Sequence, residues 1–122
     1  MTGLTVNQRK YLCTIFAVEN EKKAARVKDI AQILSVGASA ASEAVKNLAA
    51  KGFLDYEPYG LISLTDSGKN IALETLKINK IVEEFFLKVP QITPQEAAKA
   101  SSDTAALLSK EIIKKIENFC NK

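Results

Sequence analysis

The sequence predicts a mainly α-helical protein with one small β-hairpin, and three observations support this prediction. Residues 26–65 contain two short stretches in which apolar side chains recur at helical spacing, with a break at Ser35-Val36-Gly37 between them. Two β-prone runs follow, on either side of Pro58-Tyr59-Gly60. Residues 66–122 return to helical patterns. The order helix, turn, helix, hairpin predicts an N-terminal winged helix-turn-helix, followed by a C-terminal helical region.

A supporting helix is expected at the N-terminus. Thr5 and Gln8 have the spacing of a capping box, in which each side chain bonds the other residue's backbone amide. The residues that follow place apolar side chains on one side of a helix: Tyr11, Leu12, Ile15, Phe16 and Val18. This surface is large enough to pack behind a helix-turn-helix.

The first helix of the motif is expected at Val27–Leu34, where the apolar residues recur at helical spacing. Gly37 lies in the break that follows. Glycine takes positive φ without steric cost, so we expect Gly37 to supply the turn between the two helices. Ser39 or Ser42 is expected to cap or line the start of the second helix.

The second helix is expected to run to about Lys51, with Gly52 just beyond its end as the C′ residue. Two short strands, 53–57 and 61–65, then flank Pro58-Tyr59-Gly60, which is typical of a hairpin turn. Pro58 has no amide hydrogen and is therefore restricted to the turn or to a sheet edge.

A long linker helix is expected at about residues 66–89, capped by Thr65 or Asp66 and ended by Pro90. Its apolar residues cover more than one face, which requires two packing partners. Thr93-Pro94-Gln95-Glu96 then predicts a new helix start, with an interruption near residues 101–103. Ser109 is expected to cap a last amphipathic helix.

We expect residues 1–68 to bind DNA and residues 69–122 to mediate dimerisation.

Composition limits the classes of function. The chain has 122 residues, a net charge of +3 and no histidine, so ordinary catalytic triads and zinc sites are excluded, and we expect no enzyme. No apolar run reaches the ~20 residues of a membrane span, and no signal peptide is evident. The two cysteines, Cys13 and Cys120, do not suggest a disulfide framework. A cytoplasmic location is therefore expected.

Small residues crowd the start of the second helix, where Gly37, Ala38, Ser39, Ala40, Ala41 and Ser42 follow one another. A slim leading end allows a helix to approach base edges in the major groove. Alanine also simply favours helix, so this run alone does not distinguish the two interpretations. Arg26, Lys28, Lys46 and Lys51 are candidate phosphate contacts, with ordinary solvated side chains as the alternative.

These residues resemble the metal-dependent repressors typified by the diphtheria toxin repressor and the manganese transport regulator. The matching segments include residues 26–31, 41–48, 51–54, 56–60 and 64–68. The match is strong from about Thr5 to Ile71, weaker beyond, and is similar to the short, two-domain form of the family. The resemblance implies a homodimeric transcriptional regulator that binds double-stranded DNA at a palindromic operator.

Carried over by position, the resemblance implies DNA contacts at the leading end of the second helix and at the wing tip. The helix positions are Gly37, Ser39, Ala40 and Glu43, and those of the wing are Tyr59 and Gly60. Glu43 departs from expectation because a carboxylate repels phosphate. It either accepts a hydrogen bond from cytosine N4 or pairs with Lys46 along the helix, and we favour the pair. Ser42 is included as a candidate contact.

The resemblance also implies a site for Mn²⁺ or Fe²⁺, but the corresponding positions have lost their ligands. They are Lys10, Cys13, Asn79 and, approximately, Ser102, Ala105 and Ala106. Hard or borderline divalent ions require carboxylate or imidazole ligands. We therefore expect no metal cofactor. Cys13 is either a sensing thiol or a small buried side chain, and the second is the commoner role of a free cysteine.

Three functions remain. The first, which we favour, is a metal-independent DNA-binding regulator, most simply a repressor. The second is a repressor activated by Mn²⁺ or Fe²⁺ through non-standard ligands. The third is a dimerisation or interaction module with reduced DNA binding, which the modest net charge and Glu43 favour slightly.

Overall fold

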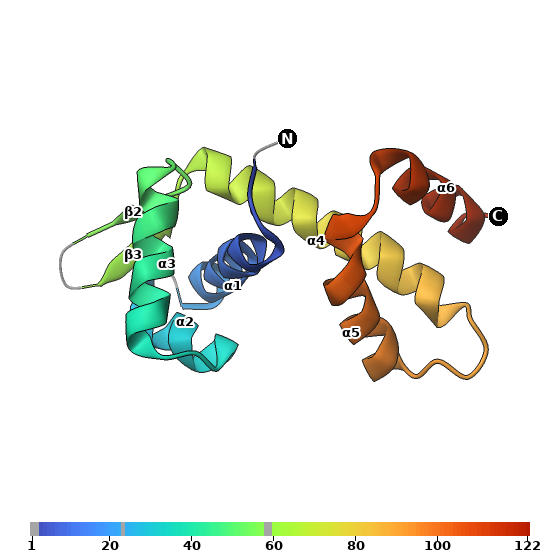
Figure 1. Ribbon diagram of the computed structural model, residues 1–122, viewed down its shortest axis with the longest axis horizontal. Helices are drawn as coiled ribbons and strands as arrows, with labels where there is room; N and C mark the ends of the chain where they lie inside the picture. Colours follow the sequence, from blue (N-terminus) through green and yellow to red (C-terminus); the bar gives the residue numbers. More distant parts are fainter. Residues whose placement is uncertain (1–2, 23, 58–59) are drawn as a thin grey trace. The chain divides into compact units, whose positions relative to one another are not determined.

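The computed structural model describes residues 3–22, 24–57 and 60–122, which are mainly helical with one small sheet (Figure 1). The elements are α1 Val6–Lys22, β1 Ala25–Arg26, α2 Val27–Leu34, α3 Ala38–Ala50, β2 Leu54–Tyr56, β3 Leu61–Leu64, α4 Asp66–Leu87, α5 Pro94–Thr104, the 3-10 helix η1 Ala105–Leu107 and α6 Lys110–Cys120. They form two compact units, Met1–Leu73 and Glu74–Lys122, whose boundary lies within α4. The predicted fold class is confirmed. The division at residue 68 into DNA-binding and dimerisation parts stays a prediction.

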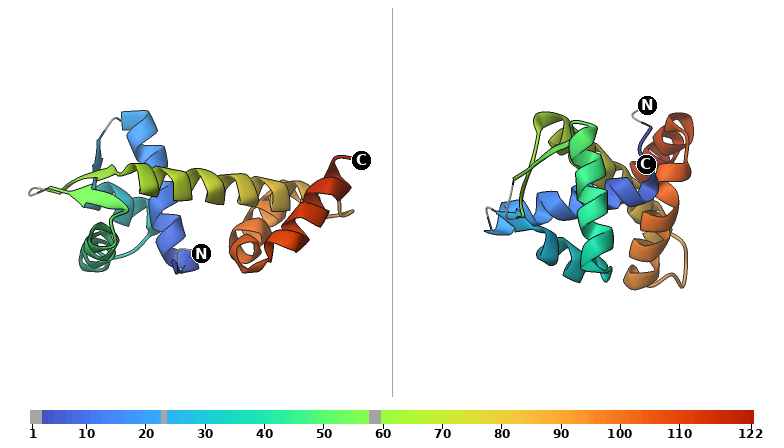
Figure 2. Two further views of the ribbon diagram at one scale, coloured as in Figure 1. Left: turned by 90° about the horizontal axis from the view of Figure 1, so that it is seen from above. Right: turned by 60° about the vertical axis from the view of Figure 1, so that its left-hand side comes forward.

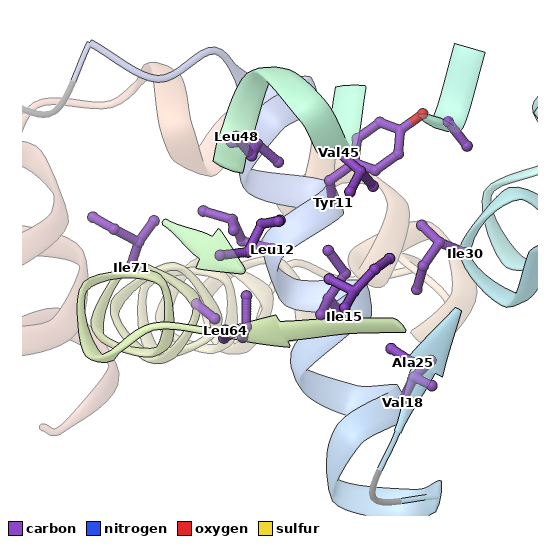
Figure 3. Packing of buried hydrophobic residues seen from close by; sticks show 14 of the residues in the cluster. Tyr11, Leu12, Ile15, Val18, Ala25, Ile30, Val45, Leu48, Leu64 and Ile71 are labelled. Carbon is purple, nitrogen blue, oxygen red and sulfur yellow. The ribbon is translucent and has the colours of Figure 1, made fainter. Parts of the chain in front are cut away.

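Helix α1 begins with the predicted capping box. The amide of Thr5 donates to Gln8 Oε1 at 2.9 Å, and the amide of Gln8 donates to Thr5 Oγ1 at 3.1 Å. Two of the amides that a helix start leaves without a partner are thereby satisfied. Figure 3 shows α1 side chains at the centre of the first unit's core, which contains Tyr11, Leu12, Ile15, Val18, Ala25, Ile30, Ala31, Ala41, Val45, Leu48, Leu54, Ile62, Leu64, Ile71 and Ala72.

The turn between α2 and α3 differs from the prediction in one respect. Its left-handed residue is Ser35, at φ 56°, whereas Gly37 has φ −69° and ψ 154°. The amide of Val36 donates to the carbonyl of Ala31 at 3.0 Å. This hydrogen bond satisfies a carbonyl in the last turn of α2, so the helix ends at the left-handed residue. Gly37 instead precedes α3 as its N-cap, a position that requires extended backbone. The expectation of positive φ at Gly37 was therefore wrong.

The start of α3 also corrects the expected cap. The helix begins at Ala38, and the structure records no side-chain hydrogen bond at its N-cap, Gly37. Ser39 and Ser42 both lie inside the helix, so neither can be its N-cap. Tertiary packing therefore positions the helix, since α3 packs against α1, α2 and β2. Figures 1 and 2 show α3 beside α2 and β2.

The end of α3 follows the prediction. Gly52 adopts φ 85°, and its amide donates to the carbonyl of Ala49 at 3.0 Å. The amide of Phe53 donates to the carbonyl of Leu48 at 3.1 Å. This pair of bonds is the Schellman arrangement, for which glycine is favoured because it has no Cβ.

The sheet has three antiparallel strands in the order β1-β3-β2. The predicted hairpin is confirmed, with Leu54 opposite Leu64 and the amide of Glu57 donating to the carbonyl of Leu61 at 2.9 Å. Its tip at Pro58 and Tyr59 lies outside the described residues. The third strand, β1, was missed because two residues are too short to show a period; Ala25 pairs with Ile62.

The second unit confirms the predicted helix starts but shifts two boundaries. Thr93 and Glu96 form a capping box at α5, with Thr93 N to Glu96 Oε1 at 2.9 Å, and Ser109 Oγ caps α6. The hydrogen bonds from the Thr93 backbone and side chain hold the pKa of the Glu96 carboxyl below its ordinary value. Helix α4 ends at Leu87 rather than near residue 89, and α5 gives way to η1 at Ala105 rather than near residues 101–103.

The second unit buries little apolar surface of its own. Its buried side chains are Val82, Ala97, Ser101 and Ala105. Helix α6 contains no buried residue, although Phe119 meets Phe85 edge-on at a centroid distance of 6.0 Å. Large apolar side chains are exposed on this unit at Leu76, Leu87, Val89, Leu107, Ile112 and Phe119.

No helix within the described ranges combines the length and apolar character needed to cross a bilayer.

Candidate nucleic-acid interface

Helix α3 has one buried and one exposed face. Ala41, Val45 and Leu48 are fully buried, and Figure 3 shows the last two directed into the core. At about 100° per residue, Ser39 and Glu43 lie on the opposite side of the helix, where both are exposed. The core therefore fixes the rotation of α3 about its own axis, and this rotation determines which residues a partner can reach.

The candidate contacts on α3 and its turn are mostly exposed. Gly37, Ser39, Ala40, Glu43 and Lys46 are exposed, whereas Ser42 is half-buried, because it lies closer to the core side of the helix. No side chain longer than serine precedes Glu43 at the front of α3, so the leading end is slim, as a major-groove helix requires.

The remaining candidates lie on other elements of the first unit. Arg26 ends β1 and Lys28 lies in the first turn of α2; both are exposed. The amide of Arg26 donates to Asp29 Oδ2 at 3.3 Å. Gly60, at φ 86°, is half-buried at the end of the wing turn, and Tyr59 lies outside the described residues. Their contacts with DNA stay predictions.

The expected ion pair between Glu43 and Lys46 is absent from the described structure. The ion pair recorded there is Lys99 Nζ to Asp103 Oδ2, at 3.1 Å on α5. Exposed i,i+3 pairs contribute only about 0.2–0.5 kcal/mol, which is too little to hold two flexible side chains together reliably. The favoured interpretation of Glu43 was therefore wrong.

One residue on the exposed face of α3 was missed. Asn47 is exposed one turn beyond Glu43, with Lys46 beside it. Asparagine can donate to and accept from an adenine edge at once. Counting four residues on from Glu43 would have revealed it in the sequence.

The positions that the resemblance implies for a metal lack carboxylate and imidazole side chains. Lys10 is exposed on α1 and carries a cation, while Ala105 and Ala106 have only methyl groups. Asn79 and Ser102 are neutral donors, and they belong to the second unit. Among the described residues no group of three or more His, Cys, Asp or Glu side chains could hold an ion. These side chains do not fit Mn²⁺ or Fe²⁺.

Cys13, the remaining former ligand position, is half-buried on α1. Its Sγ lies 3.8 Å from the carbonyl oxygen of Ala72, to which the thiol donates a weak hydrogen bond. It packs at the margin of the first unit's core. The thiol thus behaves as a small packed side chain that joins α1 to the start of α4.

Residues 3–61 match the family model described as iron dependent repressor, N-terminal DNA binding domain. An HTH-type transcriptional regulator MntR of Geobacillus thermodenitrificans is 35% identical over 82 residues, covering 67% of this chain and 58% of the relative. Residues 3–61 therefore form a DNA-binding domain of the iron-dependent repressor family. This likeness supports a DNA-binding transcriptional regulator rather than an enzyme.

Other relatives extend the likeness along the chain. An uncharacterized HTH-type transcriptional regulator of Methanocaldococcus jannaschii is 27% identical over 108 residues, covering 88% of this chain and 86% of the relative. The crystal structure of T. acidophilum IdeR has a TM-score of 0.84 at 19% identity, which establishes the shared fold. That match covers 98% of this chain but 56% of the IdeR chain, and a match to the manganese regulator SloR covers 55% of that chain, so this chain spans about half the length of both. A manganese-dependent repressor in complex with manganese has a TM-score of 0.83 at 24% identity.

Proposed function

We propose that this chain is a homodimeric repressor that binds a palindromic operator and does so without Mn²⁺ or Fe²⁺. The proposal implies a cytoplasmic site of action. The observation that carries it is a family fold with an exposed, slim α3 but with no carboxylate or imidazole side chain at the positions that the resemblance implies for a metal. DNA recognition is retained in this arrangement, while the means of switching it with an ion is lost.

The surface of the first unit supports duplex binding. Lys46 is exposed on α3, Lys51 is exposed at the C-cap of α3, and Lys28 is exposed in the first turn of α2. Each lysine that neutralises a phosphate releases a counterion, so the affinity should fall steeply with salt. Because the net charge is only +3, DNA binding would depend on individual exposed cations of this kind rather than on the overall charge.

The exposed apolar residues of the second unit support pairing of two chains. Leu107 is 75% exposed, Phe119 53% and Ile112 44%, although a helix as amphipathic as α6 normally packs its apolar face. A patch of this kind is costly in water unless another surface covers it. A symmetric dimer would cover it and would present two α3 helices to half-sites about one DNA turn apart.

The proposal is tested by fluorescence anisotropy with duplexes from the DNA upstream of the gene, with and without chelator. We expect sequence-specific binding that EDTA does not weaken and that added Mn²⁺ or Fe²⁺ does not strengthen. Lys46→Ala should weaken binding to every sequence and reduce the salt slope by about one.

The alternatives give different results. Binding that disappears in EDTA and returns with Mn²⁺ would establish a metal-activated repressor with non-standard ligands. Absence of specific binding to any duplex, together with a stable dimer in sedimentation equilibrium, would establish an interaction module. A monomer at micromolar concentration would contradict the homodimer.

A further inference from the structure

We infer that Glu43 is a specificity-determining residue, which accepts a hydrogen bond from the N4 amino group of a cytosine in the major groove. This inference rests on the proposed DNA-binding function and adds to it the base that α3 selects.

Glu43 occupies the centre of the exposed face of α3. The mean direction of Ala41, Val45 and Leu48 defines the buried side, and Glu43 lies within roughly 15° of the opposite direction at about 100° per residue. Ser39, four residues earlier on the same face, has a much shorter side chain. The Glu43 carboxylate therefore extends furthest along this part of the helix.

The Glu43 carboxylate has no partner within the described structure. No hydrogen bond or ion pair of its side chain is recorded there, and Lys46, one turn away, leaves it unpaired. A carboxylate held at the centre of a face that approaches phosphates repels them unless it meets a donor. When α3 lies in the major groove, a hydrogen-bond donor on the DNA would compensate for this repulsion.

Base-edge chemistry selects which partner that is. An ionised carboxylate only accepts hydrogen bonds. In the major groove, guanine and thymine present acceptors to a side chain, while cytosine N4 and adenine N6 present donors. In adenine, the acceptor N7 lies next to the N6 amino group. When one oxygen of the Glu43 carboxylate accepts from N6, N7 therefore repels the other oxygen. Cytosine has a C–H at the neighbouring position, so a carboxylate approaches it without that repulsion.

The Glu43 carboxylate is also expected to lower the affinity for sequences that lack the cytosine. When no donor faces it, Glu43 is left desolvated and unpaired in the negative potential of the duplex, which costs affinity. Glu43 is thereby expected to lower non-specific binding as well as to favour one base. This accounts for an acidic residue on a helix that also exposes Lys46, a candidate phosphate contact.

The test selects binding sites from a randomised duplex library with the full chain and with Glu43→Gln. Glutamine bonds adenine N6 and N7 together, so one half-site position that is cytosine for the parent chain should become adenine for the variant. Replacing that C·G pair by A·T in one half-site should weaken the parent about 5- to 150-fold and strengthen the variant. Glu111→Gln, the same chemical change on exposed α6, should leave the selected sequence unchanged.

The outcomes separate the two claims. If the parent chain selects no sequence, the proposed function fails and this inference fails with it. If the parent selects a sequence and Glu43→Gln selects the same one, the cytosine contact is overturned while DNA binding stands. If Glu43→Gln changes affinity equally on all duplexes, Glu43 contributes only charge, and the inference is likewise overturned. Unchanged circular dichroism spectra and Tm values of both variants would show that the fold is retained.

Discussion

Gly68 offers a direct test of how the linker helix is attached to the wing. It lies in the first turn of α4 and is buried. A Cβ at this position would lie 2.0 Å from the carbonyl oxygen of Phe53 and 3.2 Å from Leu64 Cδ2. The first distance is far inside van der Waals contact, so Gly68→Ala requires the backbone of one segment to move.

Neither segment can move without losing hydrogen bonds. The Phe53 carbonyl accepts from the amide of Thr65 at 3.2 Å, and Thr65 Oγ1 donates to the carbonyl of Gly52 at 2.8 Å. The same hydroxyl accepts from the amide of Gly68 at 3.2 Å and so caps α4. An alanine at 68 therefore strains the cap of α4 and the end of α3 together.

The magnitude follows from three contributions. Overpacking costs about 1–3 kcal/mol, and loss of one hydrogen bond costs about 1 kcal/mol. Alanine's better helix propensity returns about 1 kcal/mol. We expect Gly68→Ala to lower the free energy of unfolding by about 1–3 kcal/mol. At about 4 °C per kcal/mol for a chain of this size, the Tm should fall by about 4–12 °C.

Urea unfolding followed by circular dichroism at 222 nm provides the measurement, at one protein concentration because dimerisation would add to stability. Gly37→Ala is the matched control. Its φ of −69° suits alanine, and no atom lies within 4 Å of the added Cβ, so its effect should stay within about 1 kcal/mol. Equal free energies of unfolding for the two variants would refute the proposed contact with Phe53.

Three further predictions concern single positions. Ser35→Gly should stabilise the chain by up to about 1 kcal/mol, because Ser35 holds φ 56° at the end of α2; a loss of stability in urea unfolding would contradict this. Glu19 Oε1 accepts from the amide of Leu64 at 2.7 Å, so Glu19→Ala should cost about 1.5–3 kcal/mol, whereas Glu19→Gln, which keeps an acceptor oxygen, should cost less. Because hydrogen bonds with Thr93 lower the pKa of Glu96 in the folded state, the ionised carboxylate stabilises the start of α5 at pH values above the ordinary carboxyl pKa. This contribution is lost as the pH falls through the folded-state pKa. The amide NMR shift of Thr93 should follow this titration in the parent chain and remain flat in Glu96→Gln.

Much of the fold was predictable because its signals are local. The bounds of α2, Val27–Leu34, follow from apolar spacing alone. The capping boxes at Thr5 and Thr93 involve residues three apart, and Gly52 ends α3 through bonds within one turn. Such interactions form between near neighbours in the chain, so the order of residues is sufficient to predict them.

Other features required the assembled unit. β1 is a strand only because β3 lies beside it, and Glu19 meets Leu64 across 45 positions of sequence. The left-handed residue of the turn is Ser35 rather than Gly37, because the packing of α2 against α3 determines where the chain must reverse.

For the candidate site, the sequence by itself determined the small residues at the front of α3 and the lack of carboxylate and imidazole side chains at the positions that the resemblance implies for a metal, since both depend only on which side chains are present. The spacing of Ala41, Val45 and Leu48 also indicated the inner face of α3, which the structure confirms as buried, whereas the structure was needed to show that Glu43 is not paired with Lys46. The rotation of a helix is set by the core it packs against, and that core is assembled from residues far apart in the chain.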